Sequence, residues 1–318
     1  MFKKCVALLA LIYALLTAAL PAAALPDMVH GVDLSSYQGE VNWAAVKADG
    51  MDFVILRAGT SYGKDTKFEE NYTAAKAAGL GVGCYFYTYA KTPETVQKET
   101  AEMLEWLRGK QLEYPVYFDI EDPSLEPLTN DQRTTLCLTF LKQVKEAGFC
   151  GGVYASRYWF SELLDLSKLQ KAGEIWWAQW IASGKPDQDF SDYGMWQYAS
   201  DGRVNGVWGD VDMNVAYKDY PALMRQHGWN GYPLEPTPGD VDGDCTVTST
   251  DARLVLQYAV GKVTEEDLNV ALADVDSDGE ITSTDARLIL QKAVGKIDTF
   301  PTAPPEDNET PDSEESGV

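Results

Sequence analysis

Eight short apolar segments recur along residues 27–225, and they limit the possible folds more than any other feature of the sequence. They read "MVHGVDL", "DFVILRAG", "GVGCYFYTYA", "PVYFDIED", "GGVYAS", "IWWAQW", "GMWQYA" and "GDVDMNVAY". Helix-like amphipathic segments separate the early ones, at residues 43–49, 69–78, 93–108 and 130–147, whereas the later ones follow one another too closely for helices. This pattern predicts an α/β fold, a modified (β/α) barrel with helix-poor last strands.

Acidic residues lie at or near the ends of these predicted strands. Asp33 ends the first segment, Asp119 and Glu121 lie near the end of the fourth, and Asp212 lies in the last. In a parallel barrel the active site forms at the C-terminal ends of the strands, and residues two apart on a strand share a face. The first and last strands become neighbours when a barrel closes. We therefore expect all four carboxyls to converge on one cleft as the catalytic set.

Two carboxyls with different proton affinities suit the hydrolysis of a glycosidic bond. One stays protonated and donates to the leaving oxygen, while the other stays ionised and stabilises the developing cation. We predict that Glu121 is the general acid and Asp119 the ionised partner. The sequence contains only two histidines, too few for a histidine-rich metal site and little for a Ser-His-Asp triad. The alternative is that the acids cap helices or pair with Arg57 and Arg157.

Aromatic residues at other predicted strand ends offer flat faces on which sugar rings could stack. Together with Gln197 they form the predicted substrate-binding set, namely Tyr62, Tyr87, Tyr154, Trp177 and Trp180. This combination of carboxyls and aromatic side chains is typical of a glycosidase.

The motifs "GVDLSSYQG", "YPVYFDIED", "IWWAQW", "MWQYASDGRVNG" and "GDVDMN" resemble, in order, those of glycoside hydrolase family 25, the lysozymes also called N-acetylmuramidases. The motif acids of that family fall on Asp33, Asp119, Glu121 and Asp212, with the proton donor at Glu121. The resemblance implies cleavage of the β-1,4 bond between N-acetylmuramic acid and N-acetylglucosamine in peptidoglycan. It also implies retention, with the substrate's own acetamido group as a candidate nucleophile, although the sequence leaves the route open.

Two other functions are compatible with the barrel. It could hydrolyse another β-1,4-glycan such as chitin, or it could bind a glycan without cutting it. The presence of all four motif acids argues against the non-catalytic alternative.

The C-terminal part contains a repeat with the spacing of calcium loops. "DVDGDCTVTSTDARLVLQYAVGK" begins at residue 240 and "DVDSDGEITSTDARLILQKAVGK" at residue 274. Positions 1, 3, 5 and 12 of a calcium loop are acidic in both copies, and position 7 supplies a backbone carbonyl. The predicted ligands are Asp240, Asp242, Asp244, Thr246 and Asp251 in the first loop and Asp274, Asp276, Asp278, Glu280 and Asp285 in the second. We therefore expect two structural calcium ions, and none for catalysis.

This repeat resembles a dockerin module, because each loop ends in Asp rather than Glu and leads into one helix. The resemblance implies a small all-α domain and a partner, the cohesin domain of a scaffold protein. The pairs Ser249-Thr250 and Ser283-Thr284 are identical polar residues at helix starts, and we predict that they contact the cohesin. Position 6 is Gly279 in the second loop but Cys245 in the first, where a side chain could weaken calcium binding.

The sequence predicts five parts. Residues 1–24 are typical of a cleaved signal peptide, and the barrel occupies 25–230, a Pro/Gly linker 231–238, the dockerin 239–298 and a disordered acidic tail 299–318. The leading apolar run is short for the alternative, a membrane anchor. We therefore expect a secreted protein, extracellular or attached to a cell-surface scaffold, with no membrane span after cleavage.

Charge and cysteine content limit the partners and the covalent structure. The net charge of −23 argues against nucleic-acid binding. The cysteines after the signal segment lack the close spacing of a disulfide framework or a metal site. We expect buried free thiols, with a Cys137–Cys150 bridge as the alternative.

Overall fold

The computed structural model describes residues 28–181, 191–234, 236–244 and 246–301. The chain divides into two compact units, Met1–Met224 with Trp229–Tyr232, and Arg225–Gly228 with Pro233–Val318. The predicted signal peptide lies outside the described residues, as do residues 302–318 of the predicted tail.

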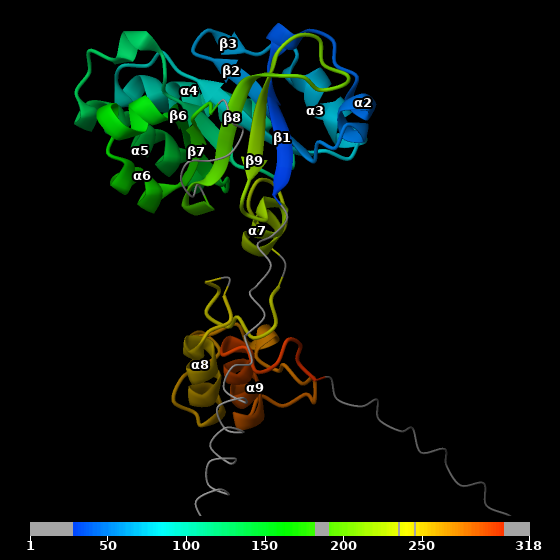
Figure 1. The fold of residues 1–318 in the computed structure, drawn as a ribbon. Helices are drawn as coiled ribbons and strands as arrows, with labels where there is room; N and C mark the ends of the chain where they lie inside the picture. The colour runs from blue at the N-terminus through cyan, green and yellow to red at the C-terminus, as the bar shows by residue number, and fades with distance from the viewer. Residues whose placement is uncertain (1–27, 182–190, 235, 245, 302–318) are drawn as a thin grey trace, which may run out of the picture. The chain divides into compact units, whose positions relative to one another are not determined.

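The first unit is built around a closed barrel (Figure 1). Its described strands are β1 (Val29–Leu34), β2 (Phe53–Thr60), β3 (Gly63–Lys64), β4 (Gly81–Tyr87), β5 (Val116–Asp119), β6 (Gly151–Ser156), β7 (Glu174–Ala178), β8 (Gly194–Gly202) and β9 (Val211–Ala216). The strand order is β1-β9-β8-β7-β6-β5-β4-β2-β3, and a further pairing between β1 and β2 closes the ring. The short β3 pairs only with β2 and stands outside that ring.

Helices connect the early strands, as the sequence predicts. They are α2 (Trp43–Ala48), α3 (Phe68–Ala77), α4 (Pro93–Leu107), α5 (Asn130–Glu146) and α6 (Leu166–Ala172), and α7 (Tyr220–His227) follows β9. The two longest begin at threonine N-caps, where Thr92 accepts from the Thr95 N–H and Thr129 forms a capping box with Gln132. No α-helix separates β7, β8 and β9 within the described residues, so the helix-poor last strands are confirmed.

The direction of β9 differs from the parallel barrel that the sequence analysis assumed. β9 runs antiparallel to both of its neighbours, β8 and β1, while the other ring pairings are parallel. The short connection from β8 to β9 leaves no room for a crossover helix, so the chain turns straight back. As a result, the start of β9 rather than its end lies at the mouth of the barrel.

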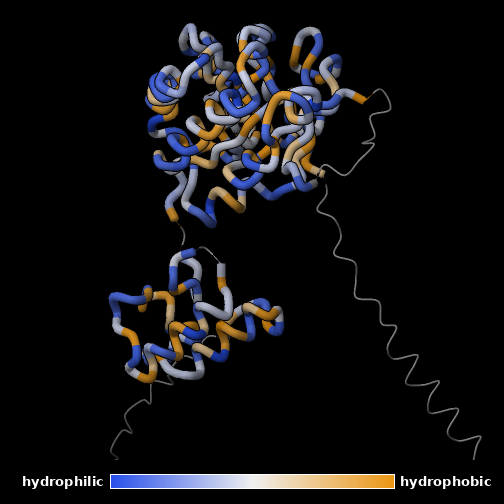
Figure 2. The backbone as a smooth tube through the Cα atoms, turned by 90° about the vertical axis from the view of Figure 1, so that its left-hand side faces the viewer, coloured by the Kyte–Doolittle hydropathy of each residue, from blue (hydrophilic) through white to orange (hydrophobic). Residues whose placement is uncertain are grey.

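Side chains alternate between two hydrophobic layers. Phe53 and Tyr117 belong to the cluster that also contains Trp176, whereas Val54 and Phe118 belong to the larger cluster that includes helix residues. Phe118, for example, stacks on Phe140 of α5 with ring centroids 4.6 Å apart. Hydrophobic and hydrophilic residues accordingly alternate along the tube in Figure 2, as amphipathic elements require.

The cysteines of the barrel are free thiols. Cys84, Cys137 and Cys150 are all buried and unbridged, so the alternative of a Cys137–Cys150 disulfide is wrong.

The second unit is a small helical domain, as predicted. It contains α8 (Ser249–Ala259), the short 3-10 helix η5 (Val270–Leu272) and α9 (Ser283–Ala293), which pack around a core of their own. Both long helices begin at a threonine that forms a capping box, Thr248 with Asp251 and Thr282 with Asp285. The repeat in the sequence is thus a repeat in local structure.

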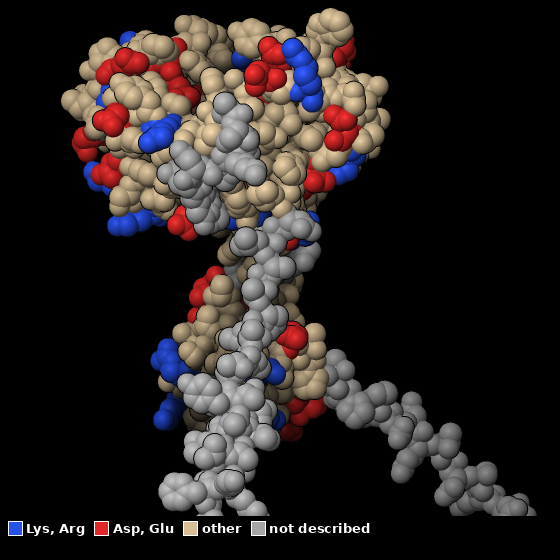
Figure 3. Space-filling model, viewed as in Figure 1, with Lys and Arg blue, Asp and Glu red and all other residues tan. Residues whose placement is uncertain are grey.

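Neither unit has a helix, among the residues described, that is long and apolar enough to cross a bilayer. On the face drawn in Figure 3, the coloured lysine and arginine side chains are interspersed with acidic ones rather than gathered into one basic patch.

Candidate active site

A cavity of about 260 Å³ opens at the mouth of the barrel, and every strand of the ring contributes to its wall. The strand residues that line it are Asp33 of β1, Arg57 of β2, Tyr85 and Tyr87 of β4, Asp119 of β5, Tyr154 of β6, Trp176 of β7, Gln197 of β8 and Asp212 of β9. Three of the four predicted acids therefore share one cavity. The reversal of β9 makes this possible, because Asp212 is the second residue of that strand.

Asp33 and Asp212 are direct neighbours across the β1–β9 pair. Burial raises the pKa of Asp33 to about 6, against the lowering effect of hydrogen bonds from Asn214, Gln197 and Asp212. Burial and the charge of Asp33 raise the pKa of Asp212 to about 8. The two carboxyls therefore share a proton at neutral pH.

Asp119 and Glu121 form the second carboxyl pair. Oδ1 of Asp119 accepts the backbone N–H of Glu121 at 3.2 Å, and Oε1 of Glu121 accepts the N–H of Ser156, at the end of β6, at 2.8 Å. Burial raises the pKa of Asp119 well above its ordinary value, and the nearby Glu121 adds to the shift. Burial also raises the pKa of Glu121, although the hydrogen bonds from Ser156 oppose the shift.

Arg57 is partnered by a different acid. Its guanidinium forms an ion pair with Asp65 at 2.7 Å and donates to Ser36 Oγ at 3.0 Å, and it lies over the ring of Tyr37. Arg57 therefore pairs with Asp65 and not with a motif acid, although its charge opposes the rise in the pKa of Asp119.

Two of the predicted aromatic residues line the cavity, and two others are exposed. Tyr87 and Tyr154 line the cavity. Tyr62 is 84% exposed and its ring contacts that of Tyr89 in a tilted arrangement, and Tyr89 in turn contacts Tyr87. Trp180 is 61% exposed and donates its indole N–H to Gln197.

Trp177 is a correction to the predicted substrate-binding set. It is 4% exposed and stacks between Phe160 and Tyr193, away from the cavity wall. Trp176 faces the cavity instead. The register explains the error, because Trp176 pairs with the inward-facing Tyr154 and neighbouring residues in register share a face.

Sequence reasoning missed several residues of the site. They include the cavity-lining Arg57, Tyr85, Trp176, Tyr37, Ser35 and Gln38, and Asn214 behind Asp33. Asn214 is two residues after Asp212 in "GDVDMN", so the period of a strand could have indicated it.

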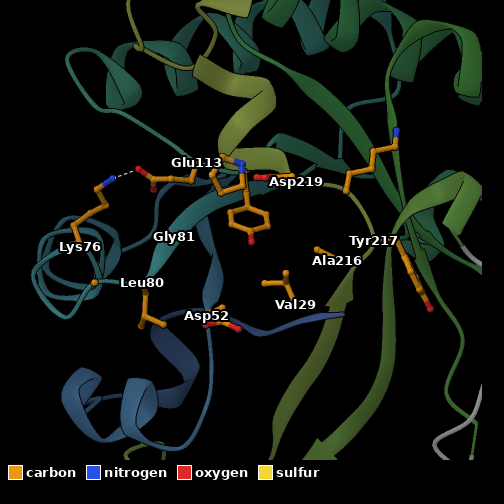
Figure 4. Close-up of a pocket in the computed structure, with 13 residues that line it drawn as sticks. Val29, Asp52, Lys76, Leu80, Gly81, Glu113, Ala216, Tyr217 and Asp219 are labelled. Carbon is orange, nitrogen blue, oxygen red and sulfur yellow. Dashed lines mark hydrogen bonds and ion pairs between the residues drawn. The ribbon is translucent and has the colours of Figure 1, made fainter. Parts of the chain in front are cut away.

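A second and larger cavity, of about 530 Å³, lies at the other end of the barrel (Figure 4). Its wall includes Val29 and Gly81, which begin β1 and β4, and Ala216, which ends the reversed β9. Lys76 and Glu113 on this wall form an ion pair with each other. We assign the active site to the smaller cavity because three of the four predicted acids meet there.

The two acidic loops of the second unit each bring three carboxylates together. Oxygens of Asp240, Asp242 and Asp244 lie within 4.8 Å of one another, and so do those of the matching residues 274, 276 and 278. Such clustered oxygens suit a hard cation such as Ca²⁺.

The acids at position 12 lie outside these clusters. Oδ1 of Asp251 accepts the N–H of Val241 at 2.9 Å, and Oδ1 of Asp285 accepts that of Val275 at 3.0 Å, so both fasten their loops. Metal binding by Asp251 and Asp285 stays a prediction. Metal binding by the backbone carbonyls of Thr246 and Glu280 stays a prediction as well. Cys245 lies outside the described residues.

Comparisons with known proteins agree with this architecture. The model of glycosyl hydrolases family 25 matches residues 32–207, and that of the dockerin type I domain matches residues 238–293. Lysozyme M1 of Streptomyces globisporus is 32% identical over 198 residues, which cover 58% of this chain and 67% of that protein. An autolytic lysozyme of Clostridium acetobutylicum is 30% identical over 188 residues, covering 58% of this chain and 55% of that protein.

A solved structure is also similar. The bacterial lysozyme of Streptomyces coelicolor is 28% identical, with a TM-score of 0.50 over 58% of this chain and 90% of that chain. The chain spans between about half and two thirds of the length of the two sequence relatives. Because the first family match covers more than half of its residues, the chain belongs to glycosyl hydrolases family 25, and a dockerin type I domain follows the barrel in its sequence.

Proposed function

We propose that the barrel is a lysozyme that hydrolyses the β-1,4 bond between N-acetylmuramic acid and N-acetylglucosamine in peptidoglycan. The main support is the convergence of Asp33, Asp119 and Asp212 on one cavity, with Glu121 beside Asp119. Two relatives that share the barrel's sequence are named lysozymes.

Glu121 is the general acid in this proposal. Its Oε1 accepts the Ser156 N–H, so the other oxygen, Oε2, is the one to hold the proton. Because burial raises its pKa, Glu121 keeps this proton to a higher pH than a solvated glutamate does. It donates the proton to the glycosidic oxygen as the bond breaks.

Asp119 is the carboxyl that stabilises positive charge. Burial raises its pKa well above its ordinary value. A cation that develops on the sugar favours the ionised form and lowers that pKa. Asp119 therefore interacts more strongly with the transition state than with the substrate, as catalysis requires.

The identity of the sugar is the part that most needs a test, because chitin contains the same kind of bond. Purified peptidoglycan is digested, and the new reducing ends are identified by mass spectrometry. Muramic acid ends support the proposal, whereas glucosamine ends or an absence of products contradict it. Products from chitin under the same conditions would favour the alternative hydrolase.

We propose further that each loop of the dockerin binds one calcium ion. The clustered carboxylates at positions 1, 3 and 5 would hold it, together with the position 7 carbonyl and the position 12 acid. Burial and neighbouring carboxylates raise the pKa of Asp242 and of Asp276, as expected where acids crowd together. Calcium would neutralise this repulsion and stabilise the folded loop.

The dockerin is proposed to attach the protein to a cohesin outside the cell. Ser249, Thr250 and Ser283 are exposed, and Thr284 is half-buried. The end of each helix also exposes two apolar residues one turn apart, Leu256 of α8 with its C-cap Val260 and Leu290 of α9 with its C-cap Val294. Exposed apolar residues rimmed by polar ones suit a protein partner. The predicted signal peptide would direct export and then be cleaved.

A further inference from the structure

The Asp33 carboxylate is held by two side-chain amides. Its Oδ2 accepts the Nδ2 group of Asn214 at 2.8 Å and the Nε2 group of Gln197 at 2.9 Å. Asn214 is 0% exposed and Gln197 2% exposed, so water does not compete for these hydrogen bonds.

Aromatic donors determine which way each amide points. The indole N–H of Trp176 donates to Asn214 Oδ1 at 2.8 Å, and that of Trp180 donates to Gln197 Oε1 at 3.0 Å. The Tyr154 hydroxyl is also 3.0 Å from Gln197 Oε1. Because an indole N–H can only donate, each amide oxygen must face its indole. The NH₂ groups of both amides must then face Asp33.

This arrangement makes Oδ2 of Asp33 a poor site for a proton. A proton there would oppose two N–H donors, and both hydrogen bonds would be lost. Asp212, its partner across the strand pair, accepts Asn214 Nδ2 through its backbone carbonyl, at 3.5 Å, and not through its carboxyl. We propose that Asn214 and Gln197 are positioning residues that keep Asp33 as the ionised member of the pair and place the pair's proton on Asp212.

The surroundings of Asp33 agree with this inference. The titratable or charged groups that face it come from several strands and are Asp212 of β9, Asp119 of β5, Arg57 of β2, Tyr85 of β4 and Tyr154 of β6. Burial raises the pKa of Asp33, and the hydrogen bonds from Asn214 and then Gln197 are the largest opposing effects. Gln197, predicted from the sequence to bind substrate, thus acts through Asp33.

If the barrel has the proposed lysozyme function, the protonation of this pair determines the pH range of activity. The active form requires Asp33 ionised and Asp212 protonated, so activity falls on the acid side when Asp33 gains a proton and on the alkaline side when Asp212 loses one. Removing an amide donor raises the pKa of Asp33. The fall of activity on the acid side then moves to higher pH, and the pH range over which the enzyme is active narrows.

The direct test is a titration of the full chain by carbon-13 NMR, with the two carboxyl signals assigned through Asp33→Asn and Asp212→Asn. We expect Asp33 to titrate below Asp212, and Asn214→Leu or Gln197→Met to raise the Asp33 midpoint by about one to two pH units. A wild-type protein in which Asp212 titrates first would overturn the inference. So would amide variants that leave the Asp33 midpoint unchanged. This titration needs no substrate, so it is independent of whether peptidoglycan is cut.

A second variant leaves both amides in place and removes only the donors that orient Gln197. Trp180→Phe combined with Tyr154→Phe deletes the two donors to Gln197 Oε1, so that the amide can turn over. We expect the Asp33 midpoint to rise here as well, and the acid limb of activity to follow it. The matched control is Asn230→Asp, a buried amide that binds backbone at Cys150 and Tyr114. It should lower Tm but move neither midpoint, and a shift as large as that of Asn214→Leu would contradict the positioning role.

Discussion

Residues of one chemical type acquire different properties from their positions around the barrel. Glu121 accepts the backbone N–H of Ser156, whereas Asp212 faces a second carboxyl. Burial raises the pKa of both groups, but only Asp212 also has the charge of Asp33 beside it. In the proposed mechanism Glu121 donates its proton, whereas the proton of the Asp33–Asp212 pair stays on Asp212.

Replacing Glu121 by Gln keeps the shape of the side chain and removes its proton. We expect Glu121→Gln to lower kcat on peptidoglycan by about 10²- to 10⁴-fold, with little change in Tm. Turnover is measured from the release of reducing ends at saturating substrate. If a folded Glu121→Gln protein lyses walls at nearly the wild-type rate, Glu121 is not the proton donor.

The pKa of Asp212 also predicts how stability depends on pH. Because its pKa rises from 3.8 to about 8 on folding, the folded state binds more protons between these values. The free energy of unfolding therefore decreases as pH rises through this range. Asp212→Asn should reduce the difference in Tm of the barrel between pH of about 5 and about 8, by roughly 2–4 °C for each kcal/mol removed.

The control for this prediction is Asp201→Asn, which removes an exposed carboxyl from β8. Scanning calorimetry of the three proteins at both pH values gives the comparison. Equal pH dependence in wild type and Asp212→Asn would show that the pair does not take up a proton on folding.

At the scale of elements, β7 places its two adjacent tryptophans on opposite faces. Trp177 packs between Phe160 and Tyr193, and Trp176 faces the cavity. We expect Trp177→Ala to lower the free energy of unfolding by about 3–5 kcal/mol, with little effect on the activity of the folded protein.

Trp180→Ala is the matched comparison, because this tryptophan is 61% exposed. Its loss should change stability by less than about 1 kcal/mol and raise KM. Denaturant unfolding and steady-state kinetics distinguish the two variants. A large loss of stability in Trp180→Ala with normal KM would contradict a sugar-stacking role.

These elements also show what could be predicted from the sequence. The apolar segments and capped helices are encoded locally, so the barrel and the strand-end acids followed from pattern alone. The face of Trp177 depends on a register set by pairing with β6, and the direction of β9 depends on how the chain returns after β8. The contacts of Asn214 with Asp33 and Trp176 join residues distant in sequence, and local pattern does not encode them.

For the whole molecule, the two units should respond differently to calcium. On the proposed calcium sites, each dockerin loop would gain folding energy when metal neutralises its clustered acids, whereas the barrel has a large core of its own. Chelator should therefore lower or abolish the transition of the dockerin and leave that of the barrel unchanged. Calorimetry of the full chain with chelator, and then with calcium restored, tests this. A single transition that ignores chelator would count against the calcium sites.

The near identity of the two dockerin repeats predicts how a cohesin would bind this module. Calcium binding requires only that the ligand positions match in the two repeats. The Ser-Thr pairs also repeat, however, and so do the exposed apolar pairs Leu256-Val260 and Leu290-Val294. A recent duplication is the simpler explanation, but repeated surfaces would let a cohesin dock on either helix, with the module turned about its pseudo-twofold axis. Changing Ser249-Thr250 alone, or Ser283-Thr284 alone, to bulky charged residues should then leave affinity nearly intact. Changing both should abolish binding.

Titration calorimetry of a matching cohesin against the two single variants and the double variant measures this. Because one intact face is enough for binding, losing the other costs only the statistical factor of two in apparent affinity, about 0.4 kcal/mol at RT of about 0.59 kcal/mol. The double variant, in contrast, places charge in both desolvated interfaces, where an unpaired charge is expensive. Calcium-dependent folding of each variant, followed by circular dichroism, separates lost recognition from lost structure. If either single variant abolishes binding while still folding with calcium, only that repeat contacts the cohesin. The hypothesis that a cohesin can dock on either helix is then wrong.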